Sequence, residues 1–289
     1  MTIVVTGATG HLGRLVVESL IERGVAPQDI RALGRTEERL SALASLGVQT
    51  AVIDFEQPET LDPAFAGADA LLLVSGSEVG KRMQQHANAI DAAVRAGVGR
   101  IVYTSAPHAD DTALVLAPEH AATEKLLADS GLTTTILRNN WYTENYVGQL
   151  DTAAQTGALV SSTANGRVAS ATRADYADAA AVVLTTPGHE GAVYELAGDV
   201  AWTFTDLAAA AGAIVGREVE YRAVSPDEHR AILVDAGLDT GTADFVVALD
   251  GNIRDGALAD APGTLSRLIG RPTTSLEDGL RAAQPAVSA

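Results

Sequence analysis

Ile3-Val4-Val5-Thr6-Gly7-Ala8-Thr9-Gly10-His11-Leu12-Gly13 is the stretch that decides the fold of this chain. The apolar run Ile3–Val5 is typical of a buried parallel strand, and the apolar residues that follow the glycines recur at helical spacing. In such a strand–turn–helix unit, Gly7 permits the sharp turn, Gly10 allows a pyrophosphate to approach the backbone, and Gly13 lets the helix pack closely. The spacing G-x-x-G-x-x-G differs from the commoner G-x-G-x-x-G, and a turn that binds nothing is the alternative. We expect the segment to bind a dinucleotide.

Strand-like apolar runs alternate with helical patterns through the first half of the chain. The expected strands are 2–6, 30–34, 48–53, 69–74, 99–104 and 133–138, and the expected helices are 11–23, 37–46, 80–96 and 119–130. Gly24, Gly47, Gly97 and Gly131 each follow one of these helices, where a left-handed residue is favoured. This alternation predicts an α/β fold with a doubly wound parallel sheet of the Rossmann type.

After about residue 140 the alternation becomes less regular. We expect a helix near 174–186 and a strand at 193–196, then helices at 203–215, 225–235 and 242–254 around a short strand at 219–223. The prediction is a Rossmann domain of residues 1–138 plus about 171–197. Residues 139–170 and 198–289 then form a smaller, mostly helical C-terminal cap that binds the substrate.

The composition excludes several classes of function. The 289-residue chain has a net charge of −17, which argues against a nucleic-acid surface, since phosphate binding needs clustered Lys and Arg. It contains no cysteine, and neither a signal sequence nor an apolar run of about 18 residues is present, so we expect a cytoplasmic protein without a membrane span. The six histidines are scattered and H-E-x-x-H is absent, so no metal site is expected.

The residue after the second expected strand bears on which dinucleotide is bound. An NAD-preferring site would have Asp or Glu at this strand end, but Arg35 follows Gly13 by 22 residues instead. A guanidinium suits the 2′-phosphate of NADP, so we expect NADPH to be preferred over NADH. The alternative is that Arg35 is only an exposed residue before a helix capped by Thr36.

Other strand ends supply further candidates for coenzyme contact, because ligands of such sheets bind beyond the carboxyl ends of the strands. Asp54 could accept from the adenine amino group while Phe55 packs on the ring, although a turn aspartate and a core aromatic is the alternative. Ser75 and Ser77 leave room for the ribose and nicotinamide, and Ser77 also suits a helix N-cap.

Thr104 and Ser105 follow the fifth strand and complete this set of coenzyme candidates. A Ser/His/Asp triad of Ser105, His108 and either Asp110 or Asp111 is disfavoured, because no G-x-S-x-G elbow exists in the chain.

The segment after the sixth strand is rich in aromatic residues. Among the four Phe, six Tyr and two Trp of the chain, Trp141, Tyr142 and Tyr146 lie close together here. Large planar side chains beside a nicotinamide would stack a planar aromatic substrate. The alternative is that Trp141 and Tyr142 anchor the cap to the core.

Several segments together resemble the NmrA-like atypical short-chain dehydrogenases/reductases. They are Thr6–Gly13, Leu73–Gly80, Tyr103–Ser105, Thr123–Leu127, Leu137–Tyr146, Ala169–Ala177 and Leu268–Leu276, and the likeness runs almost the full length. The W-Y-x-E-N-Y and S-E-V-G segments are far more specific than the glycine motif. Within the family, the sequence is most similar to the type 2 NAD(P)H:quinone oxidoreductase and triphenylmethane reductase group.

The resemblance implies a flavin-free NADPH reductase that passes hydride directly to a quinone or similar electron-poor aromatic. It also implies residue roles. The residues that it implies for coenzyme contact are Gly7, Thr9, Gly10, Leu12, Gly13, Arg35, Asp54, Ser75 and Ser105. We add His11 of the same turn. The pocket on the nicotinamide side falls to Asn140, Trp141 and Tyr142.

The chain departs from ordinary short-chain dehydrogenases at Lys125. Those enzymes carry Tyr-x-x-x-Lys, but here Ala121 stands four positions before the lysine, so the tyrosine acid is missing. Hydride addition to a ketone gives a basic alkoxide that needs a positioned proton donor, whereas a quinone gives a weakly basic phenolate that water can protonate. We expect Lys125 to contact the ribose or polarise a carbonyl. A surface lysine paired with Glu124 or Glu119 is the alternative, and His120 is a weaker candidate for proton relay.

Two further functions are left open. An NmrA-type redox sensor that binds NADP(H) without turnover fits the missing tyrosine, and a reductase of dyes or enones would use the same hydride chemistry. The expected partners are a small planar aromatic substrate and a second copy of the chain in a homodimer, without nucleic acid or membrane.

Overall fold

The computed structural model describes residues 1–76, 78 and 80–284 and divides into two compact units. The first unit comprises Met1–Asp110, Leu116–Asn139 and Arg173–Glu195. The second comprises Asp111–Val115, Asn140–Thr172 and Leu196–Ala289.

Within the described part of the chain, the first unit holds a seven-stranded sheet in the order β3-β2-β1-β4-β5-β6-β9. Its strands are β1 (Ile3–Val5), β2 (Ile30–Gly34), β3 (Gln49–Val52), β4 (Ala70–Leu73), β5 (Arg100–Ser105), β6 (Thr133–Asn139) and β9 (Val193–Leu196). Neighbouring strands from β3 to β6 pair in parallel. The Rossmann-type sheet expected from the alternating pattern is confirmed.

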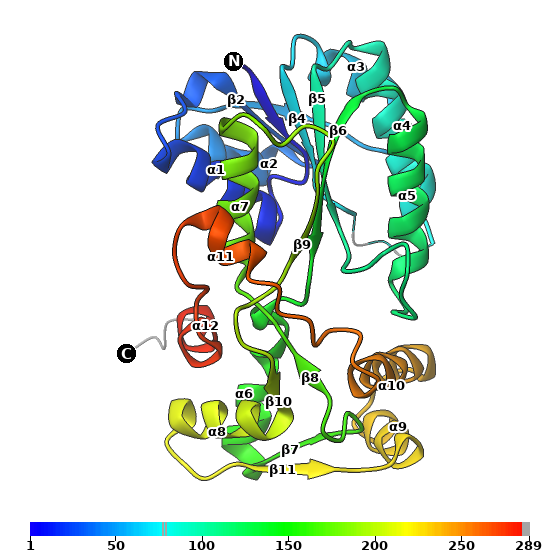
Figure 1. Cartoon of the computed structure of the whole chain (residues 1–289), viewed down its shortest axis with the longest axis vertical. Helices are drawn as coiled ribbons and strands as arrows, with labels where there is room; N and C mark the ends of the chain where they lie inside the picture. Colours follow the sequence, from blue (N-terminus) through cyan, green and yellow to red (C-terminus); the bar gives the residue numbers. More distant parts are fainter. Residues whose placement is uncertain (77, 79, 285–289) are drawn as a thin grey trace. The chain divides into compact units, whose positions relative to one another are not determined.

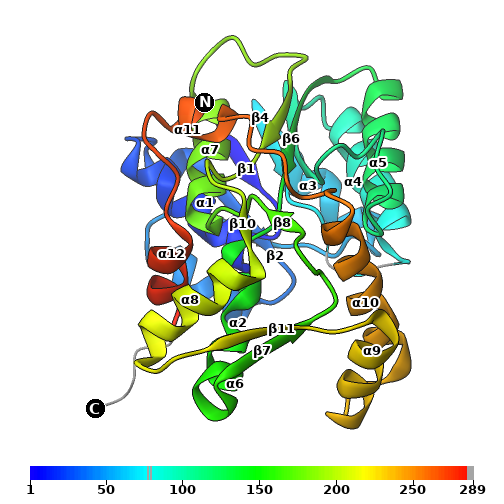
Figure 2. The same cartoon turned by 60° about the horizontal axis from the view of Figure 1, so that its bottom comes forward.

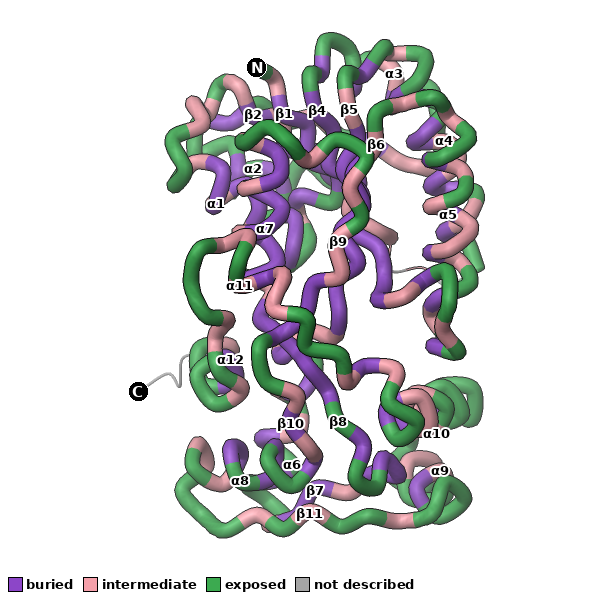
Figure 3. Tube along the Cα trace, in the orientation of Figure 1, coloured by how far each residue is buried: buried purple, intermediate pink, exposed green. Residues whose placement is uncertain are grey.

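Helices cover both faces of this sheet (Figure 1). One face carries α1 (His11–Glu22), α2 (Glu37–Ala44) and α7 (Arg173–Thr185), and the other carries α3 (Leu61–Phe65), α4 (Arg82–Arg95) and α5 (Ala117–Asp129). Short 3-10 turns lie at Pro27–Asp29 and Pro58–Thr60. Figure 3 shows buried residues running along the central strands, where the side chains of β1 are fully buried. Burial on two faces explains why these strands are continuously apolar.

The ends of two helices differ from the sequence-based expectation for local reasons. Helix α4 begins at Arg82 rather than 80, because Gly80 has φ +87°, outside the helical region. Helix α5 begins at Ala117 rather than 119, because Pro118 suits the first helical turn. The glycines expected after helices, Gly24, Gly47, Gly97 and Gly131, all have positive φ as predicted.

The second unit is mostly helical, as expected, and contains the short strand expected at 219–223 together with further short strands that the sequence pattern did not predict. Its helices are α6 (Gly148–Thr156), α8 (Phe204–Val215), α9 (Pro226–Asp235), α10 (Thr240–Arg254), α11 (Thr264–Ile269) and α12 (Leu276–Ala283), with a 3-10 turn at Thr143–Tyr146. Figure 2 shows β7 (Ala158–Ser161) beside β11 (Glu220–Ala223), which pair in parallel. Antiparallel β8 (Arg167–Val168) and β10 (Trp202–Thr203) have two residues each, too few to produce a period in the sequence.

Within residues 1–76, 78 and 80–284, no helix combines the length and apolar character needed to cross a bilayer.

Candidate cofactor site

The glycine turn between β1 and α1 is tightly packed. Gly7 has φ +58°, so it takes the left-handed conformation that the sharp turn requires. A Cβ atom on Gly13 would lie 2.3 Å from the Gly7 carbonyl oxygen, and one on Gly10 would lie 3.2 Å from the same oxygen. The sharp turn expected at Gly7 and the close helix packing expected at Gly13 are therefore present, while the approach of a pyrophosphate to Gly10 stays a prediction.

Neighbouring strands hold the turn in place. Ala8 N donates to the Leu33 carbonyl oxygen at 2.9 Å, which joins the turn to β2. The buried Thr6 hydroxyl donates to the Leu72 carbonyl oxygen at 3.1 Å and accepts from Val74 N at 3.1 Å, which joins it to β4. The turn is thus fixed by the sheet before any ligand binds.

The first turn of α1 suits a phosphate group. Its N-cap is Gly10, which supplies no side-chain cap, and the first turn contains no acidic residue. The N–H groups at a helix start and the positive end of the helix dipole favour an anion there. Thr9 is half-buried, His11 is exposed and Leu12 is buried beside this turn. The residues present therefore fit the pyrophosphate of a dinucleotide.

Arg35 follows β2 directly and is exposed. Its guanidinium forms an ion pair with Glu78 at 2.6 Å (Nη1 to Oε1), with side-chain exposures of 70% and 37%. Exposed ion pairs contribute only about 0–1 kcal/mol. A doubly charged phosphate can therefore displace Glu78 from the guanidinium at little cost.

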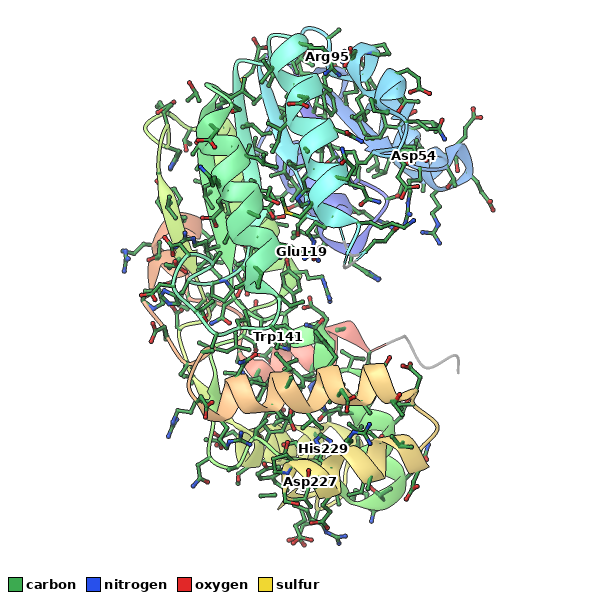
Figure 4. All side chains as sticks on the ribbon, turned by 90° about the vertical axis from the view of Figure 1, so that its right-hand side faces the viewer. Asp54, Arg95, Glu119, Trp141, Asp227 and His229 are labelled. Carbon is green, nitrogen blue, oxygen red and sulfur yellow. The ribbon has the colours of Figure 1, made fainter. Side chains whose placement is uncertain are left out.

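Asp54, labelled in Figure 4, and Phe55 follow β3. The Asp54 carboxylate accepts from Glu56 N at 2.9 Å and from Gln57 Nε2 at 3.3 Å, so it stabilises the turn. Phe55 is partly buried and packs against the main core cluster. The alternative of a turn aspartate and a core aromatic is what the structure contains, and contact with adenine stays a prediction.

Ser75 and Thr104 are joined by a hydrogen bond. Ser75 N donates to the Thr104 hydroxyl oxygen at 2.9 Å, so the end of β5 supports the loop after β4. The expected coenzyme contact by Ser77 lies outside the described residues.

Ser105 belongs to a charged cluster that sequence reasoning missed. Its hydroxyl donates to Glu124 Oε1 at 2.5 Å, and Arg138 binds both oxygens of the same carboxylate at 3.0 and 2.6 Å. The Arg138 guanidinium also contacts Glu195 at 3.0 Å and Asp110 at 2.7 Å. Hydrogen bonding to Glu124 raises the pKa of Arg138, and hydrogen bonding to Arg138 lowers the pKa of Asp110. The sequence signal for this cluster was that Glu124 stands beside Lys125 in the segment Thr123–Leu127.

The residues of the disfavoured Ser/His/Asp triad have partners in this cluster. Ser105 is bonded to Glu124, the His108 backbone N–H donates to Glu195 at 3.2 Å, and Asp110 binds Arg138.

Lys125 does not join the other candidates. Its side chain is 76% exposed and its ammonium pairs with Asp129 at 2.9 Å, one helical turn further along α5. The alternative that Lys125 pairs with Glu124 or Glu119 is wrong. Glu124 binds Ser105 and Arg138, and Glu119 binds Arg82. The helical period places Glu124, and not its neighbour, toward the sheet. A catalytic role for Lys125 stays a prediction that this exposure disfavours.

Two buried histidines lie between β5 and the helices α4 and α5. His86 Nε2 accepts from Gly76 N at 3.1 Å, and its Nδ1 lies 2.9 Å from the Thr123 hydroxyl oxygen. His120 Nδ1 lies 2.8 Å from the Tyr103 hydroxyl oxygen. Burial, reinforced by the Arg82 charge, lowers the pKa of each histidine to about 3. Both are neutral at pH 7, and His86 fastens the loop after β4 to the core.

The loop after β4 has a second attachment through Glu119, near the start of α5 (Figure 4). The Glu119 carboxylate accepts from Gly80 N at 2.9 Å and from Arg82 Nη1 at 2.9 Å. Arg82 Nε also donates to the Gly76 carbonyl oxygen at 2.7 Å. Side chains of α4 and α5 therefore hold Gly76 and Gly80, two described residues of this loop.

Asn140, Trp141 and Tyr142 belong to the second unit, where Figure 4 labels Trp141. Asn140 is buried, its side-chain amide donates to the Leu258 carbonyl oxygen at 3.2 Å, and its Oδ1 accepts from Trp141 N at 2.7 Å. Trp141 and Tyr142 are half-buried, and Tyr142 forms a β-bridge with Ala171. The fold of this unit thus holds the segment in place, and its contact with substrate stays a prediction.

Among the residues that the structure describes, no group of three or more His, Asp and Glu is arranged to hold a metal ion.

Comparison with known proteins places the chain in a family. Residues 7–187 match a family model described as NAD(P)H-binding. The chain is 47% identical to quinone oxidoreductase 2 of Escherichia coli strain K12 over 278 residues, covering 96% of this chain and 97% of that protein. It is 31% identical over 295 residues to an NmrA-like family domain-containing oxidoreductase of Aspergillus flavus, covering 97% and 94%. The chain belongs to the NmrA-like family of NAD(P)H-binding proteins.

Solved structures of NmrA-like proteins agree with this assignment. The crystal structure of the Escherichia coli NADPH-dependent quinone oxidoreductase 2 with NADPH has a TM-score of 0.93, at 46% identity over 97% of this chain and 99% of that one. The Citrobacter sp. triphenylmethane reductase complexed with NADP(H) also has a TM-score of 0.93, at 37% identity over 98% and 100%. The resemblance stated from the sequence segments is confirmed.

Proposed function

We propose that this protein is an NADPH-dependent, flavin-free oxidoreductase that transfers hydride directly to a quinone or a similar electron-poor aromatic. The observation that carries the proposal is 47% identity to quinone oxidoreductase 2 of Escherichia coli over nearly the whole of both chains. The glycine turn and the uncapped start of α1 support dinucleotide binding independently, because they fit a pyrophosphate.

The first unit binds the coenzyme in this proposal. Gly7, Gly10 and Gly13 admit the pyrophosphate, and Arg35 pairs with the 2′-phosphate after releasing Glu78. NADPH is then preferred over NADH. The exposure of Arg35 and the weakness of its surface ion pair support this assignment.

The second unit binds the acceptor, through Asn140, Trp141 and Tyr142. When bound, the coenzyme supplies the hydride, and the tasks left to the protein are orientation and proximity. The position of the usual tyrosine acid is occupied by Ala121, so the chain lacks a proton donor there. That absence favours quinone over ketone reduction, since water can protonate a phenolate without help.

Two further expectations belong to this proposal. A cytoplasmic location is supported by the absence of cysteine from the 289 residues. Assembly as a homodimer is checked by light scattering of the purified chain.

Loss of NADPH absorbance upon addition of a simple quinone tests the proposed activity. We expect turnover with NADPH and slower turnover with NADH, in the absence of added flavin. Tight NADPH binding without turnover across a panel of quinones, dyes and enones would instead identify the protein as an NADP(H)-binding sensor, which the missing tyrosine also allows.

A further inference from the structure

Ser105 occupies a place in the fold where its hydroxyl can meet a ligand. It is the last residue of β5, and dinucleotides bind beyond the carboxyl ends of such strands. The residue is only 5% exposed, and its Oγ donates to Glu124 Oε1 at 2.5 Å. The hydroxyl therefore has a fixed partner on the α5 side.

The state of Glu124 determines which way the Ser105 proton points. Arg138 donates to Glu124 through Nε at 3.0 Å and Nη2 at 2.6 Å, a two-pronged ion pair with side-chain exposures of 8% and 13%. A carboxylate held in this way is ionised, and an ionised carboxylate only accepts hydrogen bonds. The single proton of Ser105 is thus committed to Glu124, which leaves the lone pairs of Oγ for any other group.

We propose that Glu124 is a positioning residue that makes Ser105 a hydrogen-bond acceptor, and that Ser105 accepts an N–H bond from the carboxamide of the bound nicotinamide. A quinone carbonyl offers no donor, so the chemistry of this hydroxyl matches the coenzyme and not the acceptor. Ser105 is also unsuited to protonate a reduced product, because its proton is held by an ionised carboxylate. The inference rests on the coenzyme-binding half of the proposed function and not on quinone turnover.

Binding of a coenzyme analogue tests the proposal directly. In the reduced 3-acetylpyridine analogue of NADPH, a methyl ketone replaces the carboxamide and removes its N–H donors. Titration calorimetry of the full chain should give a dissociation constant for NADPH about five- to tenfold lower than for this analogue.

Two substitutions should remove that preference. Ser105→Ala deletes the acceptor, and Glu124→Gln introduces an amide that can donate to Ser105 and release its proton. In both variants we expect the ratio of dissociation constants to fall below about twofold. Should Glu124→Gln fail to fold, Ser105→Ala still tests the Ser105 contact. Glu124→Asp, whose shorter carboxylate draws away from Ser105, then tests the positioning role, with the same fall in the ratio expected.

Asp110→Asn is the matched control, since it removes another carboxylate from Arg138 without touching Ser105. This variant should keep the wild-type ratio. All variants should bind 2′-phospho-ADP-ribose, which lacks the nicotinamide, as the wild type does.

Equal binding of NADPH and the analogue by the wild type would overturn the proposal, as would an equal loss of preference in Asp110→Asn. Failure to reduce quinones leaves these binding constants measurable and counts only against the proposed activity. Failure to bind either coenzyme form would contradict both.

Discussion

Arg35 and Arg138 carry the same charge but have different surroundings. Arg35 is 70% exposed and shares one carboxylate at the surface, so its guanidinium can change partner. The Arg138 side chain is 8% exposed and contacts Glu124, Glu195 and Asp110, so its geometry is fixed. Desolvated, fully paired arginines position their neighbours, whereas exposed ones are available to ligands.

At Arg35 we expect replacement to remove discrimination between coenzymes. Arg35→Ala should raise the dissociation constant of NADPH by roughly 10- to 100-fold, the value of a charged hydrogen bond to phosphate, and should leave that of NADH nearly unchanged. Calorimetric titration with both coenzymes measures this. Arg35→Lys, which keeps the charge but loses the fork, should fall between. Equal effects on NADPH and NADH would refute the assignment.

The elements of the first unit are joined by close backbone approaches and buried polar side chains. The start of α1 packs on the glycine turn without room for a Cβ at Gly13. Between β5 and the helices α4 and α5, the neutral side chains of His86 and His120 replace apolar packing with hydrogen bonds. The α1 contact and the histidine hydrogen bonds form only when the neighbouring helix or strand lies where the structure has it.

For the α1 contact, the informative change is Gly13→Ala. The new methyl group would lie 2.3 Å from the Gly7 carbonyl oxygen, so the turn must shift. We expect a loss of about 1–3 kcal/mol in the free energy of unfolding and weaker NADPH binding. Gly148→Ala is the control, because nothing lies within 4 Å of a Cβ there and alanine favours a helix. Wild-type stability and affinity in Gly13→Ala would show that the close packing is absent in solution.

For the buried histidines, we expect stability to fall on acidification. Their pKa values are about 3 in the folded protein against an ordinary 6.5, so the unfolded chain binds protons first as the pH falls through this window. At pH 5 the loss is roughly 2 kcal/mol per histidine relative to pH 8.

Urea unfolding at pH 5 and pH 8 measures this loss. The two histidines should contribute about equally to the difference in the free energy of unfolding between pH 5 and pH 8. His120→Gln should therefore remove about half of their joint contribution. The control is His11→Gln, which removes an exposed histidine and should change the difference little. An unchanged difference in His120→Gln would mean that His120 is not buried and neutral.

At the scale of the whole molecule, the two units differ in their secondary structure. The first is a parallel sheet covered by helices on both faces, and its strand ends carry the candidate coenzyme contacts. The second is a set of helices with short paired strands, and it carries the aromatic segment. The proposed function therefore assigns coenzyme binding to the first unit and acceptor binding to the second.

The division of roles predicts separable effects. Trp141→Ala and Tyr142→Ala should each lower kcat/KM for a quinone by about tenfold through lost stacking, while the dissociation constant of NADPH stays within about twofold. Steady-state kinetics and calorimetry provide the two values, with thermal unfolding as the check on folding. Greater loss of NADPH affinity than of turnover would assign these residues a structural role.

Local patterns in the sequence determined the first unit in advance. The run Ile3–Val5, the glycines that follow it and the helical spacing after them all act within a few residues, and burial of parallel strands leaves a continuous apolar signature. For the same reason the left-handed glycines after helices were predictable, since a positive φ is a property of one residue.

Only the tertiary structure decided which side chains meet at the strand ends. Ser105, Glu124, Arg138 and Glu195 come from β5, α5, β6 and β9, and no local period relates positions so far apart. Lys125 was a candidate because a lysine can contact a ribose or polarise a carbonyl, but its position on α5 turns it to solvent. The two-residue strands β8 and β10 were likewise invisible, because their pairing partner and not their own sequence makes them strands. Residue identity sets which bonds a side chain is able to form, and packing of distant segments selects which of them exist.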